Sequence, residues 1–387
     1  MSVTAASGFE AAGVHAGLRR ARKDLAVIRS TEPAVGAALF TANRFQAAPV
    51  VVSKAHLAAA EPQALVVNSG IANAATGPRG LDDALATAAT AARILALRTE
   101  EVLVFSTGVI GTPLPVDSLL EGLPRAIAAL STDGGHDAAE AIVTTDTHPK
   151  EARVSCGGFT VGGMAKGSGM IHPRLATMLA FLTTDYPLEA GEPIEFLRPA
   201  VERSFNGISV DGECSTNDAA VLLANGGSAV PRTAASDERF ALALGQLCVE
   251  LAEEIVTDGE GATLVATIVV SGAPDEQQAR AIAARIATSP LVKTALFGRD
   301  ANWGRVVAAA GSAPHDGGFA ALDPARLSLR YNGAAVLARG VPRDIAPAVD
   351  GGDCRIELDL GLGDASATYL TTDLSYDYVR INAEYRT

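Results

Sequence analysis

The stretch KGSGMIHPRLATMLAFLTTD, residues 166–185, decides how the chain is organised. It begins in a glycine-rich segment, residues 157–169, which the sequence predicts to be a mobile arm. It continues into an apolar run, residues 178–182, which predicts a buried strand. A single hydroxyl residue, Thr177, stands directly before that run. Thr177 is therefore either the first residue of a strand or a nucleophile.

The second interpretation gives Thr177 a definite chemistry. Its hydroxyl would attack the carbonyl carbon of Ala176, and hydrolysis of the resulting ester would leave Thr177 as a new N-terminus. A free α-amine has a pKa of about 7.7 to 8.0, so it can serve as the base for its own hydroxyl near neutral pH. From the residues alone, a strand position is the ordinary alternative.

Composition limits the classes to which this chain can belong. Its 387 residues, 48% of them hydrophobic, can bury a large core in two or three domains. The net charge of −13 and the lack of a Lys/Arg-rich run argue against a nucleic-acid partner. No apolar stretch has the length of a membrane span, and the first thirty residues lack a signal-peptide core. We expect a globular, cytoplasmic protein without a membrane partner.

Cysteine and histidine spacing gives no support for a metal site. The four cysteines are far apart, as is typical of reduced cytosolic thiols, and the six histidines show neither HxxxH nor HExxH spacing. We therefore expect catalysis without a metal. His172, five residues before Thr177, is either a base or an ordinary loop residue.

Apolar patterns predict the main elements. Strands are expected at residues 8–14, 23–28, 47–52, 64–68, 102–105, 264–270, 354–360, 367–371 and 378–381, and the hydroxyl-rich run 142–150, which includes Thr144, is expected to be the exit of another strand. Helices are expected from residue 81, with Leu81, Leu85, Ala92 and Leu95 on the apolar face, and at residues 119–130, 238–257 and 277–287. An Asn-Gly pair predicts a hairpin turn at residues 331–334.

Three other places carry residues suited to acyl chemistry. A strand that breaks at Thr107-Gly108 can present a hydroxyl and backbone N–H groups at one point, as an oxyanion hole requires, although a glycine turn after a strand is common. Lys166, among glycines, offers a charge for a carboxylate or is a solvated loop lysine. Glu260, between two glycines, can approach an amine or stay on the surface.

These segments resemble a known family. Residues 163–171, GMAKGSGMI, and 176–185, ATMLAFLTTD, resemble the self-cleavage region of the ornithine acetyltransferases, also called glutamate N-acetyltransferases. In that family the Ala-Thr bond is broken, which here is Ala176-Thr177. Further matches are STGVIG at 106–111, DGECSTND at 211–218 and DGEGAT at 258–263. The resemblance covers nearly the whole chain.

The resemblance implies roles for particular residues. Thr177 corresponds to the nucleophile, and Thr107 and Gly108 correspond to the oxyanion hole. The implied substrate-binding residues are Thr144, Lys166, Thr177, Glu260, Asn382 and Thr387. No metal ligand is implied.

The resemblance also implies an α+β fold in which mixed sheets are sandwiched by helices. Cleavage would give an alpha subunit, residues 1–176, and a beta subunit, residues 177–387, which stay associated as a heterotetramer with two of each. The implied reaction is acetyl transfer from N-acetylornithine to glutamate by a ping-pong mechanism without a tightly held cofactor. Some family members also use acetyl-CoA as the donor.

Other functions remain open at this point. A self-processing aminopeptidase or amidase would use the same nucleophile but pass the acyl group to water, and a binding protein could keep the fold without cleaving itself. The sequence departs from the family pattern at Ile71 and at Arg174-Leu175. Either change could alter the acyl donor or place the enzyme in a specialised pathway outside arginine synthesis.

Overall fold

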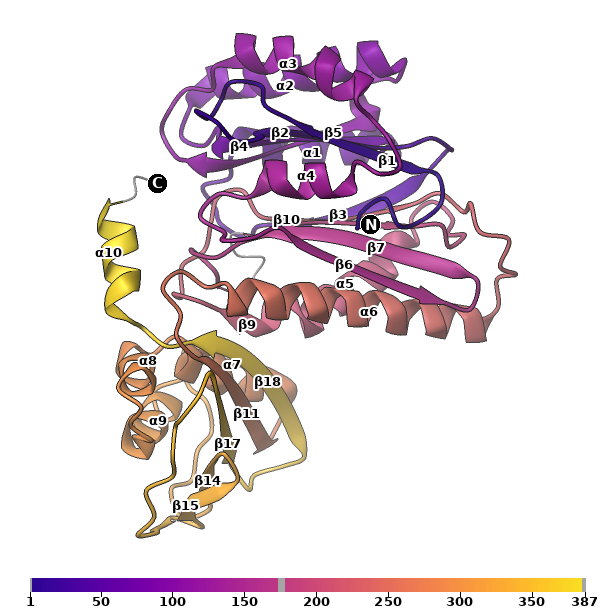
Figure 1. Cartoon of the computed structure of the whole chain (residues 1–387). Helices are drawn as coiled ribbons and strands as arrows, with labels where there is room; N and C mark the ends of the chain where they lie inside the picture. Colours follow the sequence, from indigo (N-terminus) through magenta and orange to yellow (C-terminus); the bar gives the residue numbers. More distant parts are fainter. Residues whose placement is uncertain (1, 173–177, 385–387) are drawn as a thin grey trace.

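The computed structural model describes residues 2–172 and 178–384. These residues form an α+β fold in which mixed sheets alternate with layers of helix, as predicted (Figure 1). The first two sheets are stacked with helices above, between and below them, and a third sheet with its own helices follows in the last third of the chain. None of the helices in the described ranges has the length and apolar character needed to span a membrane.

The first sheet has the strand order β1-β2-β4-β5. β1 and β2 are antiparallel, as are β2 and β4, whereas β4 and β5 are parallel. The strands are β1 (Phe9–Val14), β2 (Leu25–Ser30), β4 (Ala64–Ile71) and β5 (Val102–Val109).

The second sheet has the order β3-β10-β8-β7-β6, in which only the β10–β8 pair is parallel among the described strands. The strands are β3 (Val35–Phe40), β6 (Lys150–Cys156), β7 (Phe159–Lys166), β8 (Leu179–Thr184) and β10 (Ala219–Ala224). The first three of these precede residue 176 and the other two follow it. Strands from both sides of the predicted cleavage bond therefore share one sheet.

Helices cover both faces of these two sheets. α2 and α3 lie on the outer face of the first sheet, α4 lies between the sheets with α1 beside β5, and α5 and α6 lie on the outer face of the second sheet (Figure 1). Their bounds are α1 (Ala48–Ala59), α2 (Gly77–Leu95), α3 (Val116–Ala128), α4 (Gly135–Ile142), α5 (Pro193–Arg203) and α6 (Ala234–Thr257), with short 3-10 turns at Thr99–Glu101 and Phe205–Gly207.

Burial on both faces explains the continuous apolar strands. In β4, Leu65 and Val67 point into the core between the two sheets, whereas Val66 points toward α2 and α3. Across the central core, Phe105 of β5 meets Phe181 of β8 edge to face, with ring centroids 5.1 Å apart. A strand covered on both sides needs apolar residues at successive positions, so these segments appear in the sequence as continuous apolar runs without a period of two.

The third sheet has the order β16-β15-β14-β17-β11-β18-β9. Its strands are β9 (Ile208–Ser209), β11 (Val265–Ala273), β14 (Ser328–Tyr331), β15 (Ala334–Ala338), β16 (Val341–Pro342), β17 (Asp353–Asp359) and β18 (Ala365–Thr372). The accompanying elements are α7 (Glu276–Ala287), α8 (Pro290–Phe297), α9 (Trp303–Ala310), a small hairpin of β12 (Pro314–His315) and β13 (Gly318–Phe319), and the C-terminal α10 (Tyr376–Glu384). The predicted Asn-Gly hairpin is confirmed, with positive φ at Asn332 and Gly333.

The glycine-rich segment is not a mobile arm. Residues 159–166 form the buried strand β7, paired with β6 on one side and β8 on the other. Its glycines permit close packing, because a Cβ on Gly162 would lie 2.1 Å from the carbonyl oxygen of Ser2, and one on Gly163 would lie 2.8 Å from Leu247. Small side chains serve packing here, and the prediction mistook them for a sign of flexibility.

Two predicted strands are helices. Residues 48–52 begin α1, with Pro49 in its first turn, where the missing N–H and the fixed φ suit a helix. Residues 378–381 lie in α10, where the Ser375 hydroxyl accepts the N–H of Tyr378 in the manner of an N-terminal cap.

The predicted apolar face of α2 is wrong in its first half, whereas Ala92 is buried and Leu95 packs against the core as predicted. Leu81 and Leu85 are 37% and 44% exposed, and the helix instead buries a face of mainly small residues that includes Ala84, Ala88 and Ala91. Small residues let this helix pack closely in the layer it shares with α3.

Candidate functional site

A pocket lies where β5 of the first sheet and β7 of the second sheet end. Residues from the loop after α4, from the segment after α6 and from α10 complete its wall. The sequence-predicted site residues that line it are Thr107, Gly108, Thr144, Lys166, Glu260 and Asn382. The fold thus brings together residues that lie up to 275 positions apart in the sequence.

β5 carries Thr107 and Gly108 to the pocket. The sequence predicts that the strand breaks here, but β5 continues to Val109 because β4 pairs with it through these two residues. Gly108 has a φ of +128°, and a Cβ on it would lie 2.3 Å from the carbonyl carbon of Gly70. Glycine is therefore required by the approach of β4, and the strand end presents the buried Thr107 beside a residue without a side chain.

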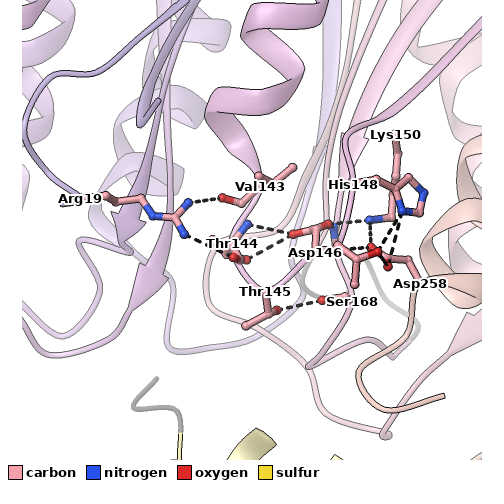
Figure 2. A network of polar contacts seen from close by, with 11 residues as sticks. Arg19, Val143, Thr144, Thr145, Asp146, His148, Lys150, Ser168 and Asp258 are labelled. Atoms are coloured by element: carbon pink, nitrogen blue, oxygen red, sulfur yellow. Dashed lines mark hydrogen bonds and ion pairs between the residues drawn. The ribbon is translucent and has the colours of Figure 1, made fainter. Parts of the chain in front are cut away.

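Thr144 lies on the loop that joins α4 to β6, and not at the exit of a strand as predicted. The preceding segment is helical because its alanines pack into the core between the sheets. Arg19 holds the loop from one side, donating to the carbonyl of Val143 at 2.6 Å and to that of Thr144 at 3.4 Å. Asp146 holds it from the other side, accepting the N–H of Thr144 at 2.9 Å (Figure 2).

A buried ion network lies behind this loop. Lys150, which is fully buried, donates to Asp146 at 2.7 Å and to Asp258 at 2.6 Å (Figure 2). Burial by itself would raise the pKa of Asp146, but the charges of Lys166 and Lys150 outweigh it and hold the pKa of this carboxyl well below its usual range. Asp146 is therefore an ionised carboxylate inside the protein.

Lys166 is the last residue of β7 and pairs with Leu179 at the start of β8. Its side chain is 3% exposed, and no hydrogen bond to its ammonium is found within residues 2–172 and 178–384. Burial lowers the pKa of Lys166, and Asp146 is the strongest of the neighbours that act against this. A nearly buried ammonium that lines a pocket is suited to bind an anionic group.

Glu260 reaches the pocket from the segment that follows α6. Its N–H donates to the carbonyl of Ser168 at 2.8 Å, and its carboxylate accepts the side chain of Asn382 from α10 at 2.8 Å. A Cβ on Gly169 would lie 2.4 Å from this carboxylate. The glycine at position 169 therefore makes room for the negative charge of Glu260.

Asp211 joins two walls of the pocket. It accepts the N–H groups of Met170 at 2.5 Å and Ile171 at 2.9 Å, and the hydroxyl of Tyr378 on α10 at 3.3 Å. Burial raises the pKa of Asp211 to about 6, against the effect of its backbone hydrogen bonds. The carboxyl therefore titrates close to neutral pH while it holds the segment that leads to residue 172.

The predicted nucleophile and cleavage site, Ala176 and Thr177, lie outside the described residues, as do Arg174-Leu175 and Thr387. The described residues on either side of positions 173–177 are held by backbone hydrogen bonds. The carbonyl of Ile171 accepts the N–H of Val210 at 2.9 Å, and the carbonyl of Met178 accepts the N–H of Ala219 at 3.1 Å.

Sequence reasoning missed several residues at this site. Asn217 donates to the carbonyls of Ala72 at 2.7 Å and Ser106 at 2.9 Å and so fixes the end of β5. Asp146 was not singled out at all. Its four-residue spacing from Lys150 is the one signal in the sequence, because nothing local shows that both side chains are buried.

The structure bears on metal binding and on one departure from the family pattern. Within residues 2–172 and 178–384, no group of three or more His, Cys, Asp or Glu side chains is arranged to hold a metal ion. The four cysteines are free thiols. Ile71 lies at the end of β4 and is not among the described residues that line the pocket.

Comparison with known proteins identifies the family. The model of the ArgJ family matches residues 10–387. The arginine biosynthesis bifunctional protein ArgJ of Symbiobacterium thermophilum is 46% identical over 400 residues, covering 100% of this chain and 98% of the relative. The protein of the same name from Methylococcus capsulatus is 48% identical over 379 residues, covering 95% of this chain and 92% of the relative.

Solved structures match part of the chain. The ArgJ protein of Bacillus halodurans is 47% identical with a TM-score of 0.42, covering 45% of this chain and 93% of its own. A structure described as ornithine acetyltransferase complexed with ornithine, from Mycobacterium tuberculosis, is 42% identical with a TM-score of 0.43, covering 44% of this chain and 94% of its own. The resemblance seen in the sequence motifs is confirmed by the near-complete match to the curated relatives: the chain belongs to the ArgJ family of arginine-biosynthesis enzymes.

Proposed function

We propose that this enzyme transfers an acetyl group from N-acetylornithine to glutamate through an acetyl ester on Thr177, after the chain has cleaved itself at Ala176-Thr177. As a member of the ArgJ family the chain is an acyltransferase, and the proposal concerns its route and substrates. The observation that carries the proposal is the lining of one pocket by Lys166, Glu260 and the Thr107-Gly108 strand end. This set provides opposite charges for an amino acid and donors for an oxyanion.

Self-cleavage comes first in the proposed sequence of steps. The Thr177 hydroxyl attacks the carbonyl carbon of Ala176, the C–N bond breaks, and the chain is joined for a time through an ester. Water then hydrolyses the ester, which leaves a carboxylate on Ala176 and a free α-amine on Thr177. That amine, with a pKa of about 7.7 to 8.0, becomes the base for the hydroxyl.

Acetyl transfer follows in two halves. The Thr177 hydroxyl gives its proton to the α-amine and attacks the acetyl carbon of N-acetylornithine, while Thr107 and Gly108 donate hydrogen bonds to the oxyanion. The C–N bond of the donor breaks, its nitrogen takes the proton, and ornithine leaves. The amine of glutamate then attacks the ester, and N-acetylglutamate is released from the regenerated hydroxyl.

The charged residues of the pocket orient the amino acids in this proposal. The Lys166 ammonium binds the carboxylate, and the Glu260 carboxylate binds the ammonium of the ornithine side chain. Thr144, Asn382 and Thr387 complete the substrate contacts. The proposed reaction uses side chains and backbone groups of the protein and no bound cofactor. Acetyl-CoA is a second candidate acetyl donor, to be assayed beside N-acetylornithine.

We also propose that the products of cleavage, residues 1–176 and 177–387, stay associated in the cytoplasm as a heterotetramer of two alpha and two beta subunits. β8 and β10 of the second sheet come from the later fragment, and β3, β6 and β7 come from the earlier one. Separation of the fragments would break this sheet.

The test combines intact mass spectrometry with an acetyl-transfer assay. Wild-type protein should show two masses in place of one near 39.5 kDa, and the larger fragment should begin with Thr177 and gain one acetyl group on incubation with N-acetylornithine. Thr177→Ala should remain a single chain without an adduct. Thr177→Ser, which keeps a hydroxyl, is the matched control and should still be cleaved.

Two outcomes would contradict the proposal in different ways. A single intact mass for active wild-type protein would rule out cleavage. Release of free acetate in place of N-acetylglutamate would show that water is the acceptor, as expected of an amidase.

A further inference from the structure

Asp146 holds three segments together behind the pocket wall through one carboxylate. Its Oδ2 accepts the N–H of Thr144 at 2.9 Å and lies 3.4 Å from the hydroxyl of the same residue. Its Oδ1 accepts the N–H of Gly167 at 2.7 Å and the ammonium of Lys150 at 2.7 Å. Gly167 follows Lys166 directly, so one buried side chain holds the backbone of Thr144 and of the residue next to Lys166, and both Thr144 and Lys166 line the pocket.

The charges around the Lys166 ammonium also point to Asp146. Three carboxyl groups and one further cation act on this ammonium. The carboxyl groups are those of Asp146, Asp218 and Glu260, and the cation is Lys150. Asp218 is 1% exposed, so its carboxyl is almost fully withdrawn from water. Burial raises the pKa of Asp218 well above its usual value, so this carboxyl ionises less readily than Asp146, whose pKa is lowered.

The remaining carboxyl groups differ in position. Glu260 stands partly exposed at the mouth of the pocket and is held by Asn382 from α10. Asp146 is therefore the buried ionised carboxylate next to Lys166, and substrate binding does not displace it because its oxygens are occupied by Thr144, Gly167 and Lys150.

We propose that Asp146 is a positioning residue of the acyl-transfer pocket, which sets the place of Thr144 and keeps Lys166 charged for binding the substrate's carboxylate. The inference deepens the proposed function and rests on it for the identity of the ligand. Asp146 touches no reacting atom in this arrangement. It acts through Thr144 and Lys166.

Asp258 provides a matched comparison. It is also buried and also pairs with Lys150, at 2.6 Å, but its other contacts are with Thr147 and His148, which are exposed. It does not line the pocket, and it is not among the strongest charges that act on Lys166. Removing the charge of Asp258 disturbs the same ion network without touching Thr144 or Gly167.

The first measurement is the pH dependence of KM for N-acetylornithine in wild type, Asp146→Asn and Asp258→Asn. An amine binds a carboxylate only while it is protonated, so KM rises above the pKa of Lys166. Loss of an adjacent opposite charge moves such a pKa by about 1 to 3 units, so this rise should begin at a pH lower by that amount in Asp146→Asn. Asp258→Asn should keep the wild-type profile, whatever it does to stability.

The second measurement needs no activity. A pulse of deuterated acetic anhydride at a series of pH values labels neutral amines, and peptide mass spectrometry reads the labelling of Lys166 relative to the exposed Lys54. The midpoint for Lys166 should fall by about one pH unit or more in Asp146→Asn and stay in place in Asp258→Asn. An unchanged midpoint in Asp146→Asn, or an equal fall in both variants, would overturn the inference.

The two readouts separate this inference from the proposed function. If the labelling midpoint shifts but the KM profile does not, Asp146 controls Lys166 as inferred, and the assignment of Lys166 to the substrate's carboxylate is wrong. Asp146→Glu keeps the charge but moves the carboxylate relative to Thr144, so it should raise KM without shifting either pH profile. If Asp146→Asn does not fold, an unchanged KM in Asp146→Glu overturns the positioning role.

Discussion

Asn382 donates a hydrogen bond of 2.8 Å from its side-chain nitrogen to Oε2 of Glu260. The two residues are 122 positions apart, on the C-terminal helix α10 and on the segment that follows α6. None of the residues of α10 from Tyr376 to Glu384 is buried, so the helix reaches the pocket through polar contacts such as this one. The contact therefore orients the Glu260 carboxylate in the pocket, and its loss should change the stability of the fold little.

Asn382→Ala should therefore weaken substrate binding with little change in stability. Asn382 also contacts the substrate in the proposed function, and a hydrogen bond to a charged group of the ligand contributes about 1.5 to 3 kcal/mol, so KM should rise about tenfold to a hundredfold. The melting temperature should change by about one degree or less because Asn382 is exposed. Steady-state kinetics and thermal unfolding measure the two effects.

The control for this prediction lies on the same helix. Arg380, which is exposed and pairs with Asp377 at 3.0 Å, does not line the pocket. Arg380→Ala should leave KM unchanged. An equal rise of KM in both variants would show that α10 as a whole was disturbed.

Thr107→Val should slow the reaction and leave the fold intact. No hydrogen bond from the Thr107 hydroxyl to another described residue is found, so valine of similar shape leaves no buried group unpaired. Loss of one oxyanion donor costs about 10² to 10³ in kcat. Stopped assays of N-acetylglutamate formation give kcat for the variant.

Thr107→Ser keeps the hydroxyl and should retain a rate within about tenfold of wild type. If valine and serine have the same kcat, the hydroxyl plays no part in the reaction. The oxyanion role would then rest on backbone N–H groups alone.

Gly108→Ala should destabilise the protein by about 3 kcal/mol or more. A Cβ at this position meets Gly70 at 2.3 Å and the nitrogen of Ile71 at 2.7 Å, in a backbone conformation with φ of +128°. Chemical denaturation in the Thr177→Ala background measures the loss on a chain that should remain uncleaved.

A substitution at Gly111 separates the steric clash with β4 from the strain of a positive φ. Its φ is +80°, and nothing lies within 4 Å of a Cβ built there, so Gly111→Ala should cost only about 1 kcal/mol from backbone strain. A similar loss at both glycines would mean that the approach of β4 to β5 does not constrain Gly108.

Particular residues show how much of the fold and of the site can be predicted from the sequence. Runs such as residues 64–68 and 179–182 are predictable because strands buried on both faces are continuously apolar. The helix at residues 48–59 is not, because a short apolar run with β-branched residues fits a strand equally well, and only packing beside β5 decides the outcome.

Some residues of the site can be predicted from the sequence and others cannot. Thr107, Gly108, Lys166 and Glu260 can be found from sequence because they sit in short motifs of glycine and polar residues that resemble a family. Asp146 and Asn217 cannot, because their importance comes from burial and from partners distant in the chain, such as Asp146 with Gly167 and Asn217 with Ala72. A polar side chain in a loop has no local feature that shows it will be enclosed.

The titration of Asp211 predicts a specific pH dependence of stability. Burial raises its pKa from 3.8 in the unfolded chain to about 6 in the folded protein, so the folded state binds the proton more tightly. The stability contributed by the protonated form is fully present below pH 4 and is lost as the pH rises through 6. The full loss is about 3 kcal/mol, from about two pKa units at 1.36 kcal/mol each.

Asp211→Asn, with an amide that cannot ionise, should remove this loss. In the Thr177→Ala background, the free energy of unfolding of the parent relative to Asp211→Asn should fall by about 2.5 kcal/mol between pH 4 and pH 7. The exposed Asp350 serves as the control, and Asp350→Asn should show no such difference. A flat difference for Asp211→Asn would show that the Met170, Ile171 and Tyr378 hydrogen bonds favour the carboxylate enough to offset its burial.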